Sequence, residues 1–107
     1  MIVFPRGAGP AYSLYAAEPN VAAVSVDHTI DPAWAAAVLQ ADAVVQGNLD
    51  PAALLAGGAA MDRSAGRILD ALARGPFVFN LGHGVLPETP PDNVERLVRR
   101  VRDYGPP

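Results

Sequence analysis

Cysteine is absent from this 107-residue chain, which excludes disulfides and thiolate metal sites. Long hydrophobic runs are absent too, because every apolar stretch is broken far short of the ~20 residues needed to cross a bilayer. The first residues, MIVFPRGAG, lack the charged and hydrophobic regions of a signal peptide. We therefore expect a cytoplasmic protein that has no membrane partner.

The chain has no excess of positive charge. Its formal net charge is -3 at pH 7, whereas nucleic-acid-binding domains are usually basic. Four arginines do gather near the end of the sequence: Arg96, Arg99, Arg100 and Arg102. Cations in a final helical turn commonly complement the helix dipole and face solvent. The cluster therefore predicts the end of a helix, and we expect no nucleic-acid partner.

Four short apolar runs recur along the chain, each followed by a turn and a helical pattern. The runs are Ile2–Phe4, Val21–Val26, Ala43–Val45 and Pro76–Phe79. They are continuous rather than alternating, as in parallel strands that are buried on both faces. This order predicts one α/β domain over residues 1–107, with four βα units, a parallel sheet and right-handed crossovers.

Proline marks the expected helix starts. Asp31-Pro32 and Asp50-Pro51 place an acidic N-cap before a proline at the first helical position. The spacing of Thr89 and Asp92 resembles a capping box before the last helix. Gly57-Gly58 predicts a flexible hinge within one connection. Helical spacing predicts an apolar stripe on each of two helices. One stripe consists of Met61, Ala65, Ile68, Leu69 and Leu72, and the other of Val94, Leu97, Val98 and Val101. Weaker helices are expected around Ala11, Leu14 and Tyr15, and around Trp34 and Val38.

Polar residues or glycines follow every predicted strand. In chain order they are Arg6-Gly7-Ala8-Gly9, Asp27-His28, Gln46-Gly47-Asn48, and Asn80 with Gly82-His83-Gly84. Ligands of parallel α/β folds bind outside the carboxyl ends of the strands. Both histidines of the chain are in this set, so we expect a binding site at this end of the sheet.

Most of these residues also have a purely structural interpretation. Arg6 and its glycines can cradle an anion, but a tight βα turn is favoured by about two to one. Asp27 suits catalysis and hydrogen bonding to nearby backbone or to His28 equally well. Gln46 and Asn48 lack acid–base capacity, so orienting or structural hydrogen bonds are favoured for both.

His83 is the sharpest candidate. Its flanking glycines allow a ligand to approach the backbone closely, and an exposed imidazole can hydrogen-bond a bound anion. The tripeptide Gly82-His83-Gly84 alone is a weak signal, and its context adds the specificity.

Four segments together resemble the C-terminal part of the uroporphyrinogen decarboxylase family: VFPRGAG, VSVDHTID, VVQGNLDP and FNLGHGVLPETPPDNVERLV. The resemblance covers essentially the whole chain, and QGNLDP and NLGHG are highly specific to that family. It implies the C-terminal half of a TIM (β/α)8 barrel. It also implies conversion of uroporphyrinogen III to coproporphyrinogen III with loss of four CO2, in haem and tetrapyrrole synthesis, without metal or cofactor.

The resemblance makes His83 a substrate-binding residue. The other candidates for supporting the site are Arg6, Asp27, His28, Gln46, Asn48 and Asn80. The family's essential aspartate, substrate-binding arginines and active-site tyrosine belong to the preceding half of the barrel. We therefore expect no catalytic residue and no metal ligand in this chain. The chain departs from the family at His28, where the family has tryptophan.

The resemblance also implies partners. A half-barrel leaves two open strand edges and an exposed inner face, so we expect self-association or pairing with an N-terminal half-barrel. We expect the chain alone to bind uroporphyrinogen weakly and to turn over nothing. The alternative is a non-catalytic tetrapyrrole-binding or assembly module. A relative of the cobamide-dependent methyltransferases is disfavoured, because those proteins hold zinc through a cysteine near the position of His83.

Overall fold

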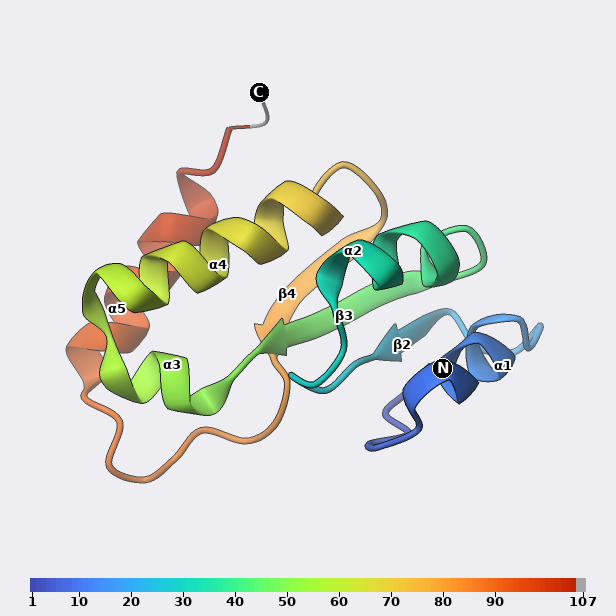
Figure 1. Ribbon diagram of the computed structural model, residues 1–107, viewed down its shortest axis with the longest axis horizontal. Helices are drawn as coiled ribbons and strands as arrows, with labels where there is room; N and C mark the ends of the chain where they lie inside the picture. The colour runs from blue at the N-terminus through green and yellow to red at the C-terminus, as the bar shows by residue number, and fades with distance from the viewer. Residues whose placement is uncertain (106–107) are drawn as a thin grey trace.

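Four parallel strands form one sheet in the computed structural model, which describes residues 1–105 (Figure 1). The strands are β1 (Ile2–Val3), β2 (Ala23–Ser25), β3 (Val44–Leu49) and β4 (Phe77–Leu81), and they lie in sequence order. This confirms the predicted α/β class and its parallel sheet. Residues 106 and 107, which belong to the predicted domain, lie outside the described part of the chain.

Helices occupy every connection between the strands and also follow β4. They are α1 (Tyr12–Ala16), α2 (Pro32–Trp34), α3 (Pro51–Ala56), α4 (Gly58–Leu72) and α5 (Pro91–Arg102). A 3-10 turn, η1 (Gly9–Ala11), precedes α1, and a π-helical stretch, η2 (Ala35–Leu39), continues α2. Within residues 1–105, no helix is long and apolar enough to span a bilayer.

The core forms between the helices and one face of the sheet. One register row of that sheet is Val3, Val24, Val45 and Phe77. Figure 1 shows α4 beside the α2–η2 helix in front of β3. The predicted stripe of α4 is confirmed, since all five of its residues are buried. Burial of this apolar surface is the main favourable term for folding.

The prediction of strands buried on both faces is wrong for β1 and β4. Phe77, Phe79 and Leu81 pack against the core, whereas Val78 between them is 47% exposed. On β1, Ile2 is 59% exposed. These strands alternate because neighbouring side chains point to opposite faces, and helices cover only one face here.

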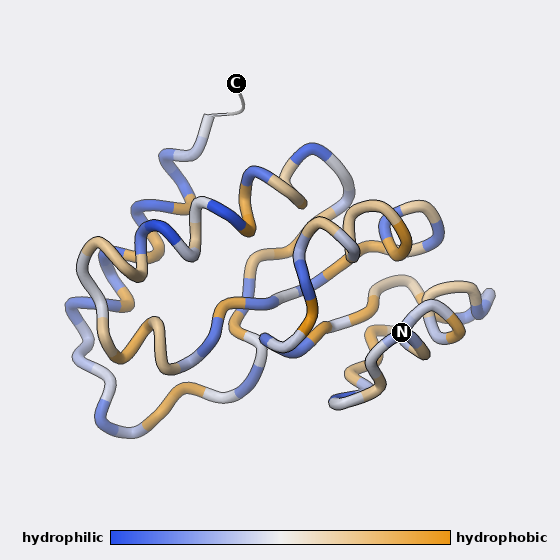
Figure 2. The backbone as a smooth tube through the Cα atoms, viewed as in Figure 1, coloured by the Kyte–Doolittle hydropathy of each residue, from blue (hydrophilic) through white to orange (hydrophobic). Residues whose placement is uncertain are grey.

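The third strand is longer than predicted. Gln46, Gly47 and Asn48 lie inside β3 rather than after it, and Asn80 lies inside β4. The paired register of β3 and β4 runs from the pair Val45–Phe77 to the pair Leu49–Leu81, and the polar residues lie within it. Pairing with a neighbouring strand therefore outweighs the low strand propensity of asparagine and glycine. In Figure 2 the tube of β3 changes from hydrophobic to hydrophilic colour at this point.

Two of the three predicted helix caps are confirmed. The side chain of Asp31 accepts a hydrogen bond from Ala33 N at 3.1 Å, and that of Asp50 accepts one from Ala52 N at 2.9 Å. The predicted capping box at Thr89 is wrong. The helix begins one residue later than that box requires, with Pro90 as the N-cap and no side-chain cap bond.

The apolar stripes of the first and last helices are only partly buried. On α5, Leu97 is buried and Val101 is half-buried, but Val94 and Val98 are exposed. In the first helix Tyr12 and Ala16 face the core. The residues used to predict that helix include Leu14 and Tyr15, which are exposed.

Candidate functional site

Asp27 is buried two residues beyond the end of β2, and both oxygens of its carboxylate accept hydrogen bonds. Gly7 N and the Tyr12 hydroxyl each donate to Oδ2 at 2.8 Å. Thr29 donates to Oδ1 through its backbone N at 2.9 Å and also through its hydroxyl. Asp27 therefore joins the loop after β1, helix α1 and the loop after β2.

These contacts set the charge of the Asp27–Tyr12 pair. Burial raises the pKa of Asp27, but hydrogen bonds from Thr29, Gly7 and Tyr12 outweigh this effect and lower the pKa to about 2. Burial, together with the hydrogen bond to Asp27, raises the pKa of Tyr12 to about 12. At pH 7 the carboxylate is charged and the phenol is neutral. A carboxylate with so low a pKa is a poor general base, so the structural interpretation of Asp27 is the one its contacts support.

The side chain of Asn48, on β3, hydrogen-bonds to the backbone of the loop after β2. Its Nδ2 donates to Asp27 O at 3.0 Å and to Ile30 O at 2.7 Å. Its neighbour Gly47 has a φ of 142°, and a Cβ there would lie 2.7 Å from Val26 O. Glycine thus permits the close approach of β3 to the end of β2, and the hydrogen bonds of Asn48 hold the two segments together.

The loop after β4 packs on the loop after β2. Gly82 N donates to Leu49 O at 2.8 Å. A Cβ on Gly82 would lie 2.9 Å from His28 Cα and closer still to His28 N. Only the absence of a side chain permits this backbone contact, which brings the loop bearing His83 against the residue His28.

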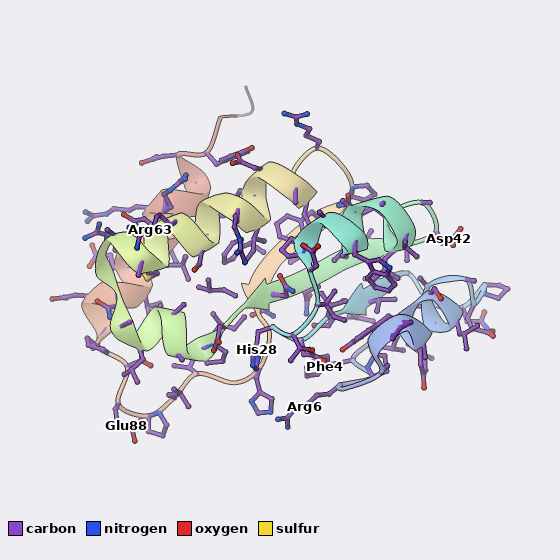
Figure 3. All side chains as sticks on the ribbon, in the orientation of Figure 1. Phe4, Arg6, His28, Asp42, Arg63 and Glu88 are labelled. Atoms are coloured by element: carbon purple, nitrogen blue, oxygen red, sulfur yellow. The ribbon has the colours of Figure 1, made fainter. Side chains whose placement is uncertain are left out.

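Three polar side chains at this end of the sheet keep their hydrogen-bonding groups free. Arg6, His28 and His83 are exposed, and within residues 1–105 none of their side chains forms a hydrogen bond or an ion pair. Figure 3 labels Arg6 and His28 at the same end of the sheet. We call these three side chains the rim.

Two of the sequence candidates lie on the sheet rather than at the rim. Gln46 Nε2 donates to Ser25 Oγ at 3.4 Å, which is a long hydrogen bond across neighbouring strands. Asn80 is exposed, and its Oδ1 accepts from Leu81 N at 2.8 Å. Neither side chain joins the network around Asp27.

Tyr12 and Thr29 were missed by the sequence interpretation. Thr29 stands two residues after Asp27, a spacing at which an aspartate commonly bonds a following backbone N–H. Tyr12 and Ala16 are four residues apart and could have identified the buried side of the first helix.

An apolar groove runs between β4 and α5. It has a volume of about 320 Å³, and its walls include Leu54, Phe79, Leu81, Val94 and Val98. The groove lies beside β4, one of the two edge strands of the described sheet. Within residues 1–105, no three His, Asp or Glu side chains are grouped so as to hold a metal ion.

Comparison with known proteins identifies the family. Residues 1–104 match the family described as "Uroporphyrinogen decarboxylase (URO-D)". The uroporphyrinogen decarboxylase of Sphingopyxis alaskensis is 53% identical over 102 residues, which are 95% of this chain and 30% of that protein. The Erythrobacter litoralis protein of the same name is 55% identical over 104 residues, with 97% and 30% covered. The chain thus spans about 30% of the length of these relatives, and it belongs to the uroporphyrinogen decarboxylase family.

Proposed function

We propose that the chain forms the C-terminal part of a uroporphyrinogen decarboxylase, which converts uroporphyrinogen III to coproporphyrinogen III with loss of four CO2. The family match over residues 1–104 carries this proposal. The rim supports it, because ligands of parallel α/β folds bind beyond the carboxyl ends of the strands.

The role we assign to this chain is binding. The substrate carries many carboxylates, which need cationic and hydrogen-bonding groups. His83 supplies one such group, and its imidazole has no competing partner among the described residues. Decarboxylation proceeds when a protonated pyrrole carbon makes the ring an electron sink for the pair of electrons left by CO2. The side-chain carbon that loses CO2 then gains a proton and the ring carbon gives its proton up, so that one proton replaces each CO2.

The chemical step requires a further group, which we do not assign to the described residues of this chain. A carboxylate facing the pyrrole N–H groups would stabilise the positive charge that develops on the ring. Asp27 is the buried carboxylate of the described residues, and its oxygens are already occupied by Gly7, Tyr12 and Thr29. We infer that the catalytic aspartate lies in the remaining part of the enzyme and that the chain alone is inactive.

The partner we propose is that remaining part. The chain corresponds to about 30% of its relatives, and β1 and β4 are both edge strands of its sheet. A barrel has no edge strands, so further strands along β1 and β4 would close it. The apolar groove beside β4 would be covered in the same step.

A chimera tests the proposal. In the Sphingopyxis alaskensis enzyme, the matched segment is replaced by residues 1–104 of this chain, and kcat/KM for uroporphyrinogen is measured. We expect an active chimera, because 53% of the matched residues are identical. The change His83→Ala should raise KM about 10- to 150-fold, which corresponds to the roughly 1.5–3 kcal/mol of a charge-assisted hydrogen bond. The matched control is Arg63→Ala, which removes an exposed cation on α4 away from the rim.

Two results would count against it. A chimera that folds but forms no product would favour the alternative of a non-catalytic tetrapyrrole-binding module, provided that it still binds the tetrapyrrole. An unchanged KM on His83→Ala, with a large loss of thermal stability, would assign His83 a structural role.

A further inference from the structure

The two histidines of the chain are neighbours, although they are 55 positions apart in the sequence. The backbone of Gly82 lies against the backbone of His28, as the Cβ position of Gly82 shows. Since consecutive Cα atoms are about 3.8 Å apart, the Cα atoms of His28 and His83 lie within about 8 Å of each other. Two imidazoles at that spacing can reach a single carboxylate placed between them.

Two other polar side chains near these loops donate or accept hydrogen bonds that hold backbone groups. Asp27 and Asn48 use their side chains to hold neighbouring backbone. The loops that carry His28 and His83 are therefore fixed by groups other than the imidazoles. Both histidines are exposed and have no hydrogen-bond partner within residues 1–105, so holding the fold together does not account for them.

The neighbouring surface suits an anion with an apolar body. Arg6 stands at the same end of the sheet, on the loop that Gly7 ties to Asp27. Phe4, in the segment after β1, and Val78, on β4, are exposed apolar residues. Donors beside an exposed apolar surface are the combination that a flat, carboxylate-edged ring requires.

We propose that His28 and His83 together hold one carboxylate of the ligand, so that His28 is a second binding residue at the rim. This inference rests on the proposed function and gives a specific ligand contact to His28, which the sequence marks only as a candidate for supporting the site. The contact of Gly82 with His28 fixes the spacing of the pair.

The test uses the whole 107-residue chain and uroporphyrin, a stable octacarboxylate ring. Binding is followed by porphyrin fluorescence for the parent chain, His28→Ala, His83→Ala, the double variant and the Arg63→Ala control. We expect each single histidine variant to weaken binding about tenfold or more. The double variant should lose less than the product of the two single effects, because residues that share one partner are energetically coupled.

Ring resonances of the histidines supply a second measurement. The chain has two histidines, so their NMR signals can be assigned with the two single variants, and both should shift when uroporphyrin is added. Thermal unfolding of each variant should match the parent chain, because both side chains are exposed.

The outcomes separate this inference from the proposed function. If His28→Ala binds like Arg63→Ala while His83→Ala is weak, the pairing is wrong and the proposed function stands. Independent, multiplicative effects of the two variants would also overturn the shared carboxylate. If the parent chain does not bind uroporphyrin, or if His83→Ala binds as the parent does, the binding role in the proposed function fails, and the pairing fails with it.

Discussion

At the scale of single residues, the partners of a side chain separate structural from functional candidates. The sequence could not decide between two roles for Asp27, because its partners Gly7 and Tyr12 lie 20 and 15 residues away. The preference for His83 depended on local glycines, and its exposure and lack of a partner among the described residues agree with that preference. The closeness of His28 to His83 could not be predicted, since it depends on the packing of two loops.

Asp27 should give the chain a characteristic loss of stability in acid. Its pKa in the folded state is about 2, against 3.8 for an unperturbed aspartate. The charged carboxylate therefore stabilises the fold above pH 3.8, and this stabilisation is lost as the pH falls towards 2. It amounts to about 2 kcal/mol.

The change Asp27→Asn should remove this pH dependence. We expect the free energy of unfolding of Asp27→Asn to be lower at neutral pH and to change less than that of the parent chain below about pH 4. Urea unfolding at a series of pH values measures both quantities. An equal acid dependence in the two proteins would show that the hydrogen bonds accepted by Asp27 do not stabilise the fold.

At the scale of elements, local signals were predictable and long-range pairing was not. The caps at Asp31 and Asp50 could be predicted, because an N-cap bonds to a backbone N–H two residues away. The extent of β3 could not, because its polar residues stay in the strand through pairing with β4. The N-cap at Thr89 was predicted wrongly, because the second of two prolines, Pro91, takes the first helical position and α5 starts one residue later.

Gly82 and Gly84 provide a matched pair of variants for the loop after β4. A Cβ at Gly82 would lie 2.9 Å from His28 Cα, against backbone that cannot rotate away, whereas a Cβ at Gly84 meets nothing within 4 Å. We expect Gly82→Ala to lower the free energy of unfolding by about 1–3 kcal/mol. Gly84→Ala should stay within about 0.5 kcal/mol of the parent chain. Thermal or urea unfolding decides, and equal effects of the two changes would contradict the packing of this loop on His28.

At the scale of the whole molecule, one face of the sheet stays exposed, because no helix within residues 1–105 covers it. The order of strands and helices was predictable, because continuous apolar runs alternate with helix signals. The one-sided burial of β1 and β4 was not, since it depends on which elements cover each face. Ile2, Phe4 and Val78 remain exposed, and apolar exposure of this kind commonly marks an interface.

We therefore expect the isolated chain to self-associate at micromolar concentration, most simply as a two-fold dimer. Sedimentation velocity measures this directly. The change Val78→Ser on β4 should weaken association, whereas Leu14→Ser should not, although Leu14 is 70% exposed, because it lies on α1. A sharply melting monomer would show that the exposed face needs no partner.

The most direct test of the central claim is a complementation assay, since the claim is that this chain contributes binding and no catalytic group. Coproporphyrinogen formation is measured for the chain alone, for the Sphingopyxis alaskensis enzyme lacking its matched segment, and for the two refolded together. We predict product only from the mixture. Product from the chain alone would contradict the account, and so would a folded, associated mixture that forms none.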